Sequence, residues 1–209
     1  MPDFTETCRL CPRLARHLDR VRAEYPAYHA LPVAPYGAAR PRLLVVGLAP
    51  GMHGANRTGR PFTGDHAGIL LYETLHRYGY ASRPVSTGRR DGLALERCRI
   101  TNAVKCLPPA NRPTPAEIVR CNRYLRTEVD ALPRGAAVLA LGVIAHDAVL
   151  LAFGMKRSSH RFRHGARYEL PRGCTLFDSY HCSRYNTQTK RLTPSMFQAV
   201  FTAIAEYLS

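Results

Sequence analysis

The residues best suited to chemistry in this sequence stand just after short apolar runs. A glycine-rich stretch, residues 47–65, follows the apolar run 43–46 and ends on Asp65. Asn102 and His181 stand at the ends of two further apolar runs, and both side chains can donate or accept hydrogen bonds. Because ligands of open α/β sheets bind at the carboxyl ends of the strands, we expect these segments to form one site.

Asp65, Asn102 and the nearby Phe62 each also have a simpler structural explanation. Asp65 in "TGDHAG" can cap a helix that begins near residue 66, and Asn102 at a strand end can bond its own backbone. Phe62, within the glycine-rich stretch, is either a ring that stacks on a ligand or a loop anchor packed on the core. Residue types alone therefore leave a structural and a chemical role open at all three positions.

Seven cysteines are an odd number, which argues against a complete disulfide framework and favours reduced thiols or metal ligands. Four of them form two pairs that together supply four thiolates: Cys8, Cys11, Cys106 and Cys121. The first pair has the two-residue spacing of metal ligands, whereas the second pair alone is open to coincidence. Four thiolates suit zinc or an iron–sulfur cluster. Cys98 and Cys174 lie in predicted strands, where a cysteine serves as a small apolar residue, and Cys182 also lacks a partner.

The sequence is strongly basic, with 30 Lys and Arg against 15 Asp and Glu and a net charge of +15 spread along the chain. Such a surface favours polyanions and is typical of nucleic-acid binding, although it also promotes solubility. The N-terminus has no secretory signal pattern, and no run approaches the roughly 20 apolar residues of a membrane helix. We expect a soluble cytoplasmic protein with no membrane partner, and a monomer.

Strands and helices alternate along the chain. Strands are predicted at residues 43–47, 98–104, 136–142 and 174–180. One intervening helix begins with the N-cap, N1 proline and capping-box acid of Thr114, Pro115 and Glu117. Another ends near Gly154, and the last helix, after Thr193 and Pro194, places four apolar residues on one face: Phe197, Val200, Phe201 and Ile204. This alternation predicts an α/β fold, with a parallel sheet covered on both faces, as a single domain over residues 1–209. The connection after the third strand is predicted to be a simple helix start.

Three motifs, together with the four paired cysteines, resemble the family 5 (type b) uracil-DNA glycosylases, which are relatives of the family 4 enzymes. The motifs are "GLAPGMHGANRTGRPFTGD", "ITNAVKC" and "HCSRYNTQTKRLT", and the resemblance spans Cys8 to about Thr193. Family 4 enzymes usually carry an acidic residue where this chain has Leu48. The chain departs from the family at Cys182, where members often have proline or another small residue, but His181 is in place.

The resemblance implies a three-layer α/β/α fold with a four-stranded parallel sheet, a [4Fe-4S] cluster on the four cysteines, and removal of damaged bases from DNA. A flipped base would meet residues of the first two motifs and the motif histidine: Gly47, Ala49, Pro50, Gly51, Phe62, Asn102 and His181. The catalytic residues would be Asp65, Asn102 and His181. His181 would donate to the departing base, and Asp65 would orient water and stabilise the cationic sugar. DNA would be held by the segment after the last strand, through Ser183, Arg184, Tyr185, Asn186, Lys190 and Arg191.

The leading hypothesis is a monofunctional glycosylase of base excision repair, because the motifs place no Schiff-base nucleophile. Its substrates would be uracil and other deaminated bases such as hypoxanthine, in double- or single-stranded DNA. A non-catalytic protein of the same fold that binds lesions or abasic DNA is the first alternative, and a zinc-stabilised enzyme acting on free nucleotides is the second. The basic run 156–164 has no counterpart in the family motifs, so it is either a phosphate-facing loop or merely exposed.

Overall fold

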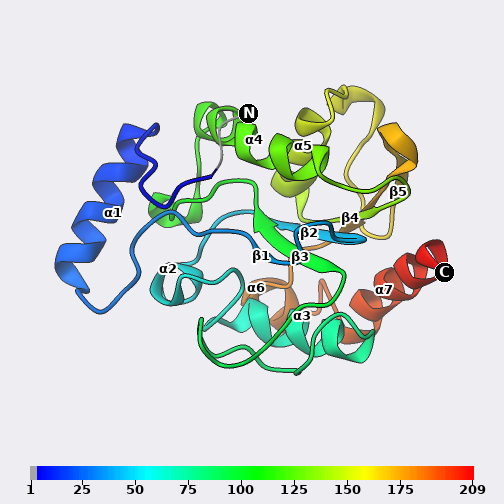
Figure 1. Cartoon of the computed structure of the whole chain (residues 1–209), viewed down its shortest axis with the longest axis horizontal. Coiled ribbons are helices and arrows are strands. Elements are labelled where there is room, and N and C mark those ends of the chain that lie inside the picture. Colours follow the sequence, from blue (N-terminus) through cyan, green and yellow to red (C-terminus); the bar gives the residue numbers. More distant parts are fainter. Residues whose placement is uncertain (1–3) are drawn as a thin grey trace.

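A six-stranded sheet organises the computed structural model, which describes residues 4–209 (Figure 1). The strand order is β1-β3-β2-β4-β6-β5. The four central strands are parallel: β3 (Cys98–Asn102), β2 (Leu43–Gly47), β4 (Ala137–Leu141) and β6 (Thr175–Ser179). The predicted four-stranded parallel sheet is therefore confirmed. Two short antiparallel strands, β1 (Tyr36–Gly37) and β5 (Arg167–Glu169), extend its edges. At two and three residues they are too short to leave a periodic signal in the sequence.

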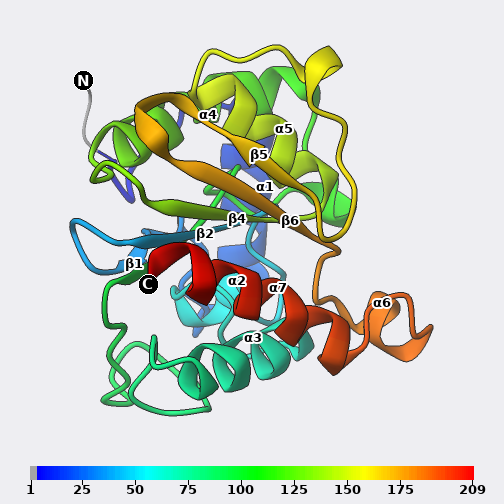
Figure 2. The same ribbon diagram turned by 90° about the vertical axis from the view of Figure 1, so that its right-hand side faces the viewer.

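Helices cover both faces of the sheet, because the side chains on both faces of the central strands are apolar. Leu43 and Val45 of β2 belong to a core formed with α3 (His66–Arg77) and α7 (Pro194–Leu208). Leu44 and Val46 belong to a second core formed with α4 (Pro115–Asp130) and α5 (Val143–Ala152). Figure 2 shows α3 and α7 below the sheet and α4 and α5 above it. This arrangement is the three-layer fold expected from the alternating pattern.

The helix starts follow the expected chemistry. In α4, the Thr114 side chain accepts from the Glu117 N–H and the Glu117 carboxylate accepts from the Thr114 N–H, which confirms the capping box. Helix α5 ends at Ala152, and Gly154 beyond it has a φ of 71°. Helix α7 is capped by Thr193, and all four of its predicted core residues are buried.

Three further helices lie outside the alternating pattern. Helix α1 (Pro12–Glu24) packs Leu14 and Leu18 against the chain that follows β3. Helix α2 (Ala55–Thr58) lies inside the glycine-rich stretch, and α6 (Arg184–Gln188) follows β6. Single 3-10 turns occupy Pro109–Asn111, Arg157–Ser159 and Pro171–Gly173. Across residues 4–209, no helix is both long and apolar enough to cross a membrane.

Candidate active site

A cavity of about 510 Å³ opens at the carboxyl ends of the parallel strands. The segments that follow β2, β3, β4 and β6 all contribute to its wall, at the edge where open α/β sheets bind ligands. Most of the residues singled out in the sequence line it: Ala49, Gly51, Phe62, Asp65, Asn102, His181, Ser183 and Arg184. Pro50 is buried and lies outside the lining. Gly47 also lies outside the lining, next to the Phe62 ring and the Asn102 carboxamide.

Asp65 caps α3 and also faces the cavity. Its Oδ1 accepts a hydrogen bond from the Gly68 N–H at 3.2 Å, as the simpler explanation predicted. Its Oδ2 lies against Gly51 and Gly54, and a Cβ atom at Gly54 would collide with this carboxylate. Burial raises the pKa of Asp65, and hydrogen bonds from the backbone of Gly68 and Ala67 offset part of that rise. Capping and a position in the pocket therefore coexist in one side chain.

Phe62 is held in an unfavourable backbone conformation, with a φ of 53°. The carbonyl of the preceding Pro61 accepts from the Tyr72 hydroxyl at 2.9 Å and from the Thr63 hydroxyl at 3.2 Å, which fixes the chain at this bend. The ring is buried and packs within the core, as the loop-anchor interpretation predicted, and it also lines the cavity. One edge of the ring packs on Gly47, where a Cβ would lie 2.5 Å from Cζ.

Asn102 is the last residue of β3 and pairs in register with Gly47 of β2. Its side chain is 3% exposed, and Gly47 leaves the room that its Oδ1 occupies. Within residues 4–209 the Asn102 carboxamide makes no hydrogen bond, neither to its own backbone nor to another side chain. A buried carboxamide at a cavity wall that leaves its donors and its acceptor available is suited to a polar ligand.

His181 follows β6, and its ring lies beside that of Phe62 in the wall of the cavity. The two ring centroids are 5.7 Å apart and the ring planes are inclined by 26°. Burial lowers the pKa of His181 to about 4, so the imidazole is neutral at neutral pH. The Asn186 amide donates to the His181 carbonyl at 2.8 Å and thereby fixes the backbone of this residue. Cys182 is fully buried beneath the loop.

The segment predicted to hold DNA has two kinds of residues. Ser183 caps α6, and Asn186 braces His181, so both support the loop itself. Arg184, Tyr185 and Lys190 are exposed, Tyr185 by 70%, while the Arg191 guanidinium lies 4.7 Å from the Tyr180 ring centroid. None of the three cations of this segment forms an ion pair with a residue of the described chain.

The cavity also includes residues that the sequence did not single out. The connection between β4 and α5 forms an apolar wall with Leu141, Gly142, Val143 and Ile144, so the prediction of a simple helix start there was incomplete. Val143 is 52% exposed at the start of an otherwise buried helix. Asn111 and His66 complete the rim, and His66 Nε2 lies 2.9 Å from the Thr187 hydroxyl, joining α3 to α6. The position of this connection at the carboxyl end of a parallel strand was the signal that could have identified the wall.

The four paired cysteines line a second, smaller cavity beneath α1, separate from the pocket. The Lys105 N–H donates to Cys121 Sγ at 3.3 Å, and the Tyr124 hydroxyl donates to Cys8 Sγ at 3.2 Å. In the part of the chain that the structure describes, no group of three or more His, Cys, Asp or Glu side chains is arranged to hold a metal ion. The remaining cysteines, Cys98, Cys174 and Cys182, are buried.

Comparison with known proteins identifies the family of this chain. The family model described as the uracil DNA glycosylase superfamily matches residues 34–205. A type-5 uracil-DNA glycosylase of Thermus thermophilus is 49% identical over 198 residues, which cover 92% of this chain and 90% of the relative. A type-5 enzyme of Mycobacterium tuberculosis is 45% identical over 93% of this chain and 75% of the relative, and a type-4 uracil-DNA glycosylase of Thermotoga maritima is 34% identical over 69% and 63%. The chain belongs to the type-5 branch of the uracil-DNA glycosylase superfamily.

Proposed function

We propose that this protein removes uracil from DNA by hydrolysing the N-glycosidic bond, leaving an abasic site. The observation that carries the proposal is the meeting of Asp65, Asn102, Phe62 and His181 around one cavity of about 510 Å³. Its support from comparison is the 49% identical type-5 uracil-DNA glycosylase. A base inside a duplex cannot be reached by these side chains, so the nucleotide must first be flipped into the cavity.

Two residues are proposed to hold the flipped base. Phe62 offers its ring as a stacking surface, and Asn102 offers a donor and an acceptor to the pairing edge of uracil. The carboxamide lines the cavity and has no hydrogen-bond partner within residues 4–209, which supports this role because a ligand can supply the partners. Gly47 makes both positions possible by leaving space for Phe62 and Asn102.

His181 is proposed to stabilise the departing base. Cleavage leaves negative charge on the uracil oxygens, and a neutral imidazole N–H can donate to one of them. Its low pKa, about 4, supports a neutral donor that hydrogen-bonds the oxyanion without transferring its proton at neutral pH. The hydrogen bond from Asn186 to the His181 carbonyl would keep this donor in position.

Asp65 is proposed to act on the sugar side of the bond. A carboxylate can stabilise the oxocarbenium-like sugar and orient the attacking water. Its Oδ1 is engaged by the Gly68 N–H, which fixes the rotamer and leaves Oδ2 for this task. The glycines at 51 and 54 provide the space for that oxygen. Among residues 4–209, no lysine lines the cavity, which supports a monofunctional enzyme.

We further propose that the cavity accepts deaminated purines such as hypoxanthine. On the side of the first motif, its wall includes three small residues beside Leu48 and Phe62, and these small residues support room for a second ring: Ala49, Gly51 and Ala55. The apolar wall from the β4–α5 connection adds contacts that do not depend on base identity. Base preference then rests mainly on Asn102.

We also propose that the four paired cysteines hold a [4Fe-4S] cluster, although within residues 4–209 their side chains are not arranged as a metal-ligand set. All four thiols line one cavity, and N–H or O–H donors point at Cys121 and Cys8, as around cluster-ligating sulfurs. Lys105 and Arg120 lie beside them and would offset the negative charge of four thiolates. When bound, the cluster would act as a cross-link between the N-terminal segment and α4. It would stabilise the fold and take no part in bond cleavage, since the cavity of the cysteines is separate from the pocket.

An oligonucleotide duplex with a single uracil, incubated with the protein and then treated with alkali, tests the proposal. Strand scission at the uracil position is expected, because alkali cleaves abasic sites. Binding without scission would instead indicate the non-catalytic lesion-binding alternative. A parallel duplex with hypoxanthine tests the wider substrate range, and activity on uracil alone would contradict the permissive pocket.

A further inference from the structure

A strongly basic loop, residues 156–165, lies outside the site described above. Four of its side chains are exposed cations: Lys156, Arg157, Arg161 and Arg163. Arg157 forms an ion pair with Asp147 at 3.1 Å, whereas neither Arg161 nor Arg163 has an acidic partner within residues 4–209. Two exposed guanidinium groups without an acidic partner, separated by one residue, are suited to bind acceptors on an anionic polymer.

The loop is anchored by aromatic packing. Phe162, between the two arginines, turns inward and has its ring centroid 5.8 Å from that of His146 and 6.1 Å from that of Tyr180. Arg161 and Arg163 on either side remain exposed. The inward ring therefore fixes the direction in which the two guanidinium groups are presented.

A buried polar pair also holds the loop. His146 Nδ1 lies 2.8 Å from Asp178 Oδ1, and His146 Nε2 lies 2.7 Å from the His160 carbonyl oxygen. Both partners are acceptors, so each contact needs a proton, and the imidazole serves both when it is fully protonated. Burial lowers the pKa of His146, but the hydrogen bond and charge of Asp178 outweigh it and raise the pKa above its usual value. His146 and Asp178 are completely buried, and such a pair holds its partners in one geometry.

The far end of the loop is joined to the segment that follows β6. The Tyr180 N–H donates to His164 Nδ1 at 3.2 Å, and the two rings stack with centroids 5.0 Å apart and planes inclined by 14°. The guanidinium of Arg191 lies over the same Tyr180 ring in a cation–π contact. Tyr180 precedes His181 of the pocket, so the loop and the predicted DNA segment share one support. Figure 2 shows the loop descending beside β6 toward the chain that leads into α6.

From these contacts we propose that the loop 156–165 is a second phosphate-binding segment, through which Arg161 and Arg163 contact the DNA backbone beside the stretch held by residues 184–191. The proposal rests on the proposed function for its partner, DNA. It assigns the loop to affinity and not to bond cleavage, because none of its residues lines the cavity. Each phosphate neutralised by an arginine releases condensed counterions, which makes its contribution visible in the salt dependence of binding.

The test is the double variant R161A/R163A, which changes exposed side chains and leaves the anchoring residues in place. Binding to a labelled 30-base-pair duplex is measured by anisotropy between 50 and 200 mM salt. Loss of two phosphate contacts should make the slope of log affinity against log salt shallower by about 1.8, at about 0.9 per phosphate. Single-turnover excision of uracil at saturating protein should keep its wild-type rate, while the protein concentration for half-maximal rate rises.

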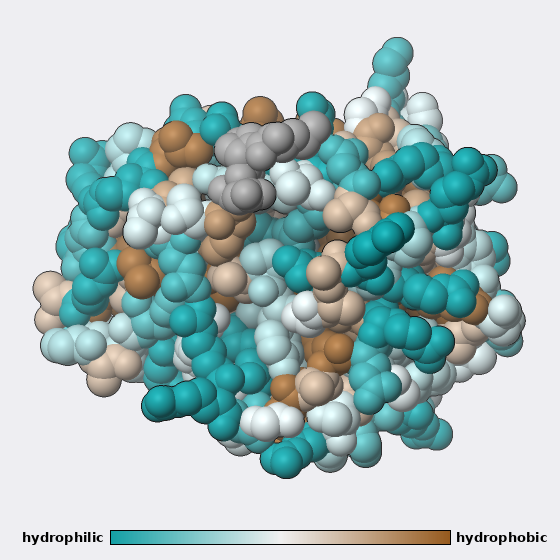
Figure 3. All heavy atoms as spheres, in the orientation of Figure 1, coloured by the Kyte–Doolittle hydropathy of each residue, from teal (hydrophilic) through white to brown (hydrophobic). Residues whose placement is uncertain are grey.

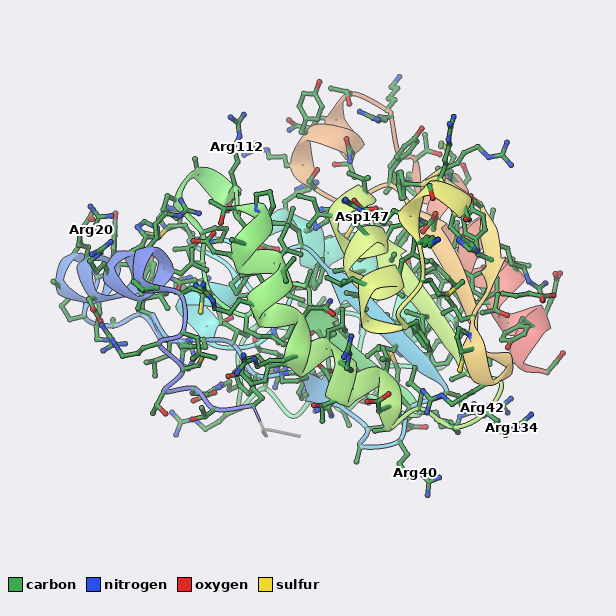
Figure 4. The ribbon with its side chains drawn as sticks, turned by 90° about the horizontal axis from the view of Figure 1, so that it is seen from above. Arg20, Arg40, Arg42, Arg112, Arg134 and Asp147 are labelled. Atoms are coloured by element: carbon green, nitrogen blue, oxygen red, sulfur yellow. The ribbon has the colours of Figure 1, made fainter. Side chains whose placement is uncertain are left out.

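The matched control is R40A/R134A, which removes the same charge from the other end of the molecule. Arg40 and Arg134 precede β2 and β4 and project away from Arg112, which follows the Asn111 rim of the pocket (Figure 4). This control should retain the wild-type slope to within a few tenths. A slope unchanged in R161A/R163A, or lowered equally in the control, would overturn the proposal. Wild-type protein that binds DNA but leaves uracil in place would refute the proposed function and leave the loop assignment to be judged by the slopes.

Discussion

The rings of Phe62 and His181 lie 5.7 Å apart between centroids, with their planes inclined by only 26°. Two ring contacts of about 3.5 Å each would need about 7 Å, so no base fits between the two rings as they stand. A base that stacks on Phe62 beside the imidazole would instead lie with its plane nearly parallel to the imidazole plane. An imidazole N–H then points along the plane of the base, which is the direction of its carbonyl lone pairs. The pair therefore favours stacking by one ring and an edge hydrogen bond by the other.

Phe62→Met tests the stacking half of this relationship. Methionine retains apolar volume but lacks a flat face, and base stacking on an aromatic ring contributes about 1–3 kcal/mol. The variant should raise the protein concentration for half-maximal single-turnover excision by roughly 5- to 150-fold. Because Phe62 also packs in the core, thermal unfolding is measured in parallel, at a temperature where the variant stays folded. Wild-type excision by the folded variant would remove the ring from base recognition.

Among the residues after β6, we expect the exposed cations to contribute to DNA affinity and Asn186 to hold His181 in position. Arg184→Ala and Lys190→Ala each remove an exposed cation and should each make the salt slope shallower by about 0.9. Asn186→Ala should leave the slope unchanged but slow excision, because its amide donates to the His181 carbonyl. Anisotropy titrations and single-turnover rates of the three variants measure the two effects. The reverse pattern, with slope lost in Asn186→Ala and rate lost in Arg184→Ala, would contradict the assignment.

The central fold could be predicted from the sequence because its signals are local. The four parallel strands are apolar runs, and helices α4 and α7 begin at caps that the sequence displays, Thr114 and Thr193. The edge strands β1 and β5 depend on pairing with β3 and β6, and two or three residues carry no periodicity of their own. Helix α1 begins at Pro12, directly after Cys11, and no apolar strand precedes it to complete the alternating pattern.

The candidate site was predictable where it depended on motifs and less so where it depended on packing. Asp65, Asn102 and His181 line one cavity, as the common strand edge required. The apolar wall at Val143 and Ile144 was missed because an apolar residue at a helix start resembles core. The role of Asn186 was also not predictable, because its amide donates to the His181 carbonyl, a contact that composition cannot indicate. Figure 3 shows hydrophilic side chains over much of one face, with hydrophobic ones scattered among them. The basic composition did not reveal which cations have acidic partners.

Anaerobically purified protein should contain about four iron atoms per chain if the proposed cluster is present. Cys121→Ala should lower the iron content and the folded yield together, because the cluster would join α1 to α4. Cys174→Ala is the matched control: this cysteine is also buried but lies in a different core cluster, so iron content should stay at the wild-type value. Protein with zinc and no iron would refute the cluster.

The pH dependence of excision should follow Asp65 rather than His181. Burial raises the pKa of Asp65 above its usual value, so its carboxylate is lost progressively as the pH falls through that raised pKa. The pKa of His181, about 4, keeps the imidazole neutral throughout the range where an ordinary histidine would titrate. Single-turnover rates should therefore fall as the pH is lowered, and the fall should begin at a higher pH than an ordinary aspartate would give. A rate that halves near pH 6.5 would show that His181 titrates like an exposed histidine.

Asp65→Asn separates the two roles of this residue most sharply. Asparagine caps a helix nearly as well as aspartate, so the cap on α3 and the thermal stability should be retained. If the charge acts on the sugar, single-turnover excision of uracil should slow by about 10²-fold or more, with DNA binding nearly unchanged, and the acid fall in rate should disappear.

The complementary control for Asp65→Asn is Thr193→Ala. It removes the side-chain cap of α7 and should cost about 1 kcal/mol of stability while leaving the excision rate intact. Asp65→Asn keeps the cap of α3 and loses the carboxylate charge, whereas Thr193→Ala loses the cap of α7 and keeps the Asp65 charge. Full excision by Asp65→Asn would reduce Asp65 to a helix cap and leave the electrostatic stabilisation of the sugar to be sought elsewhere in the cavity.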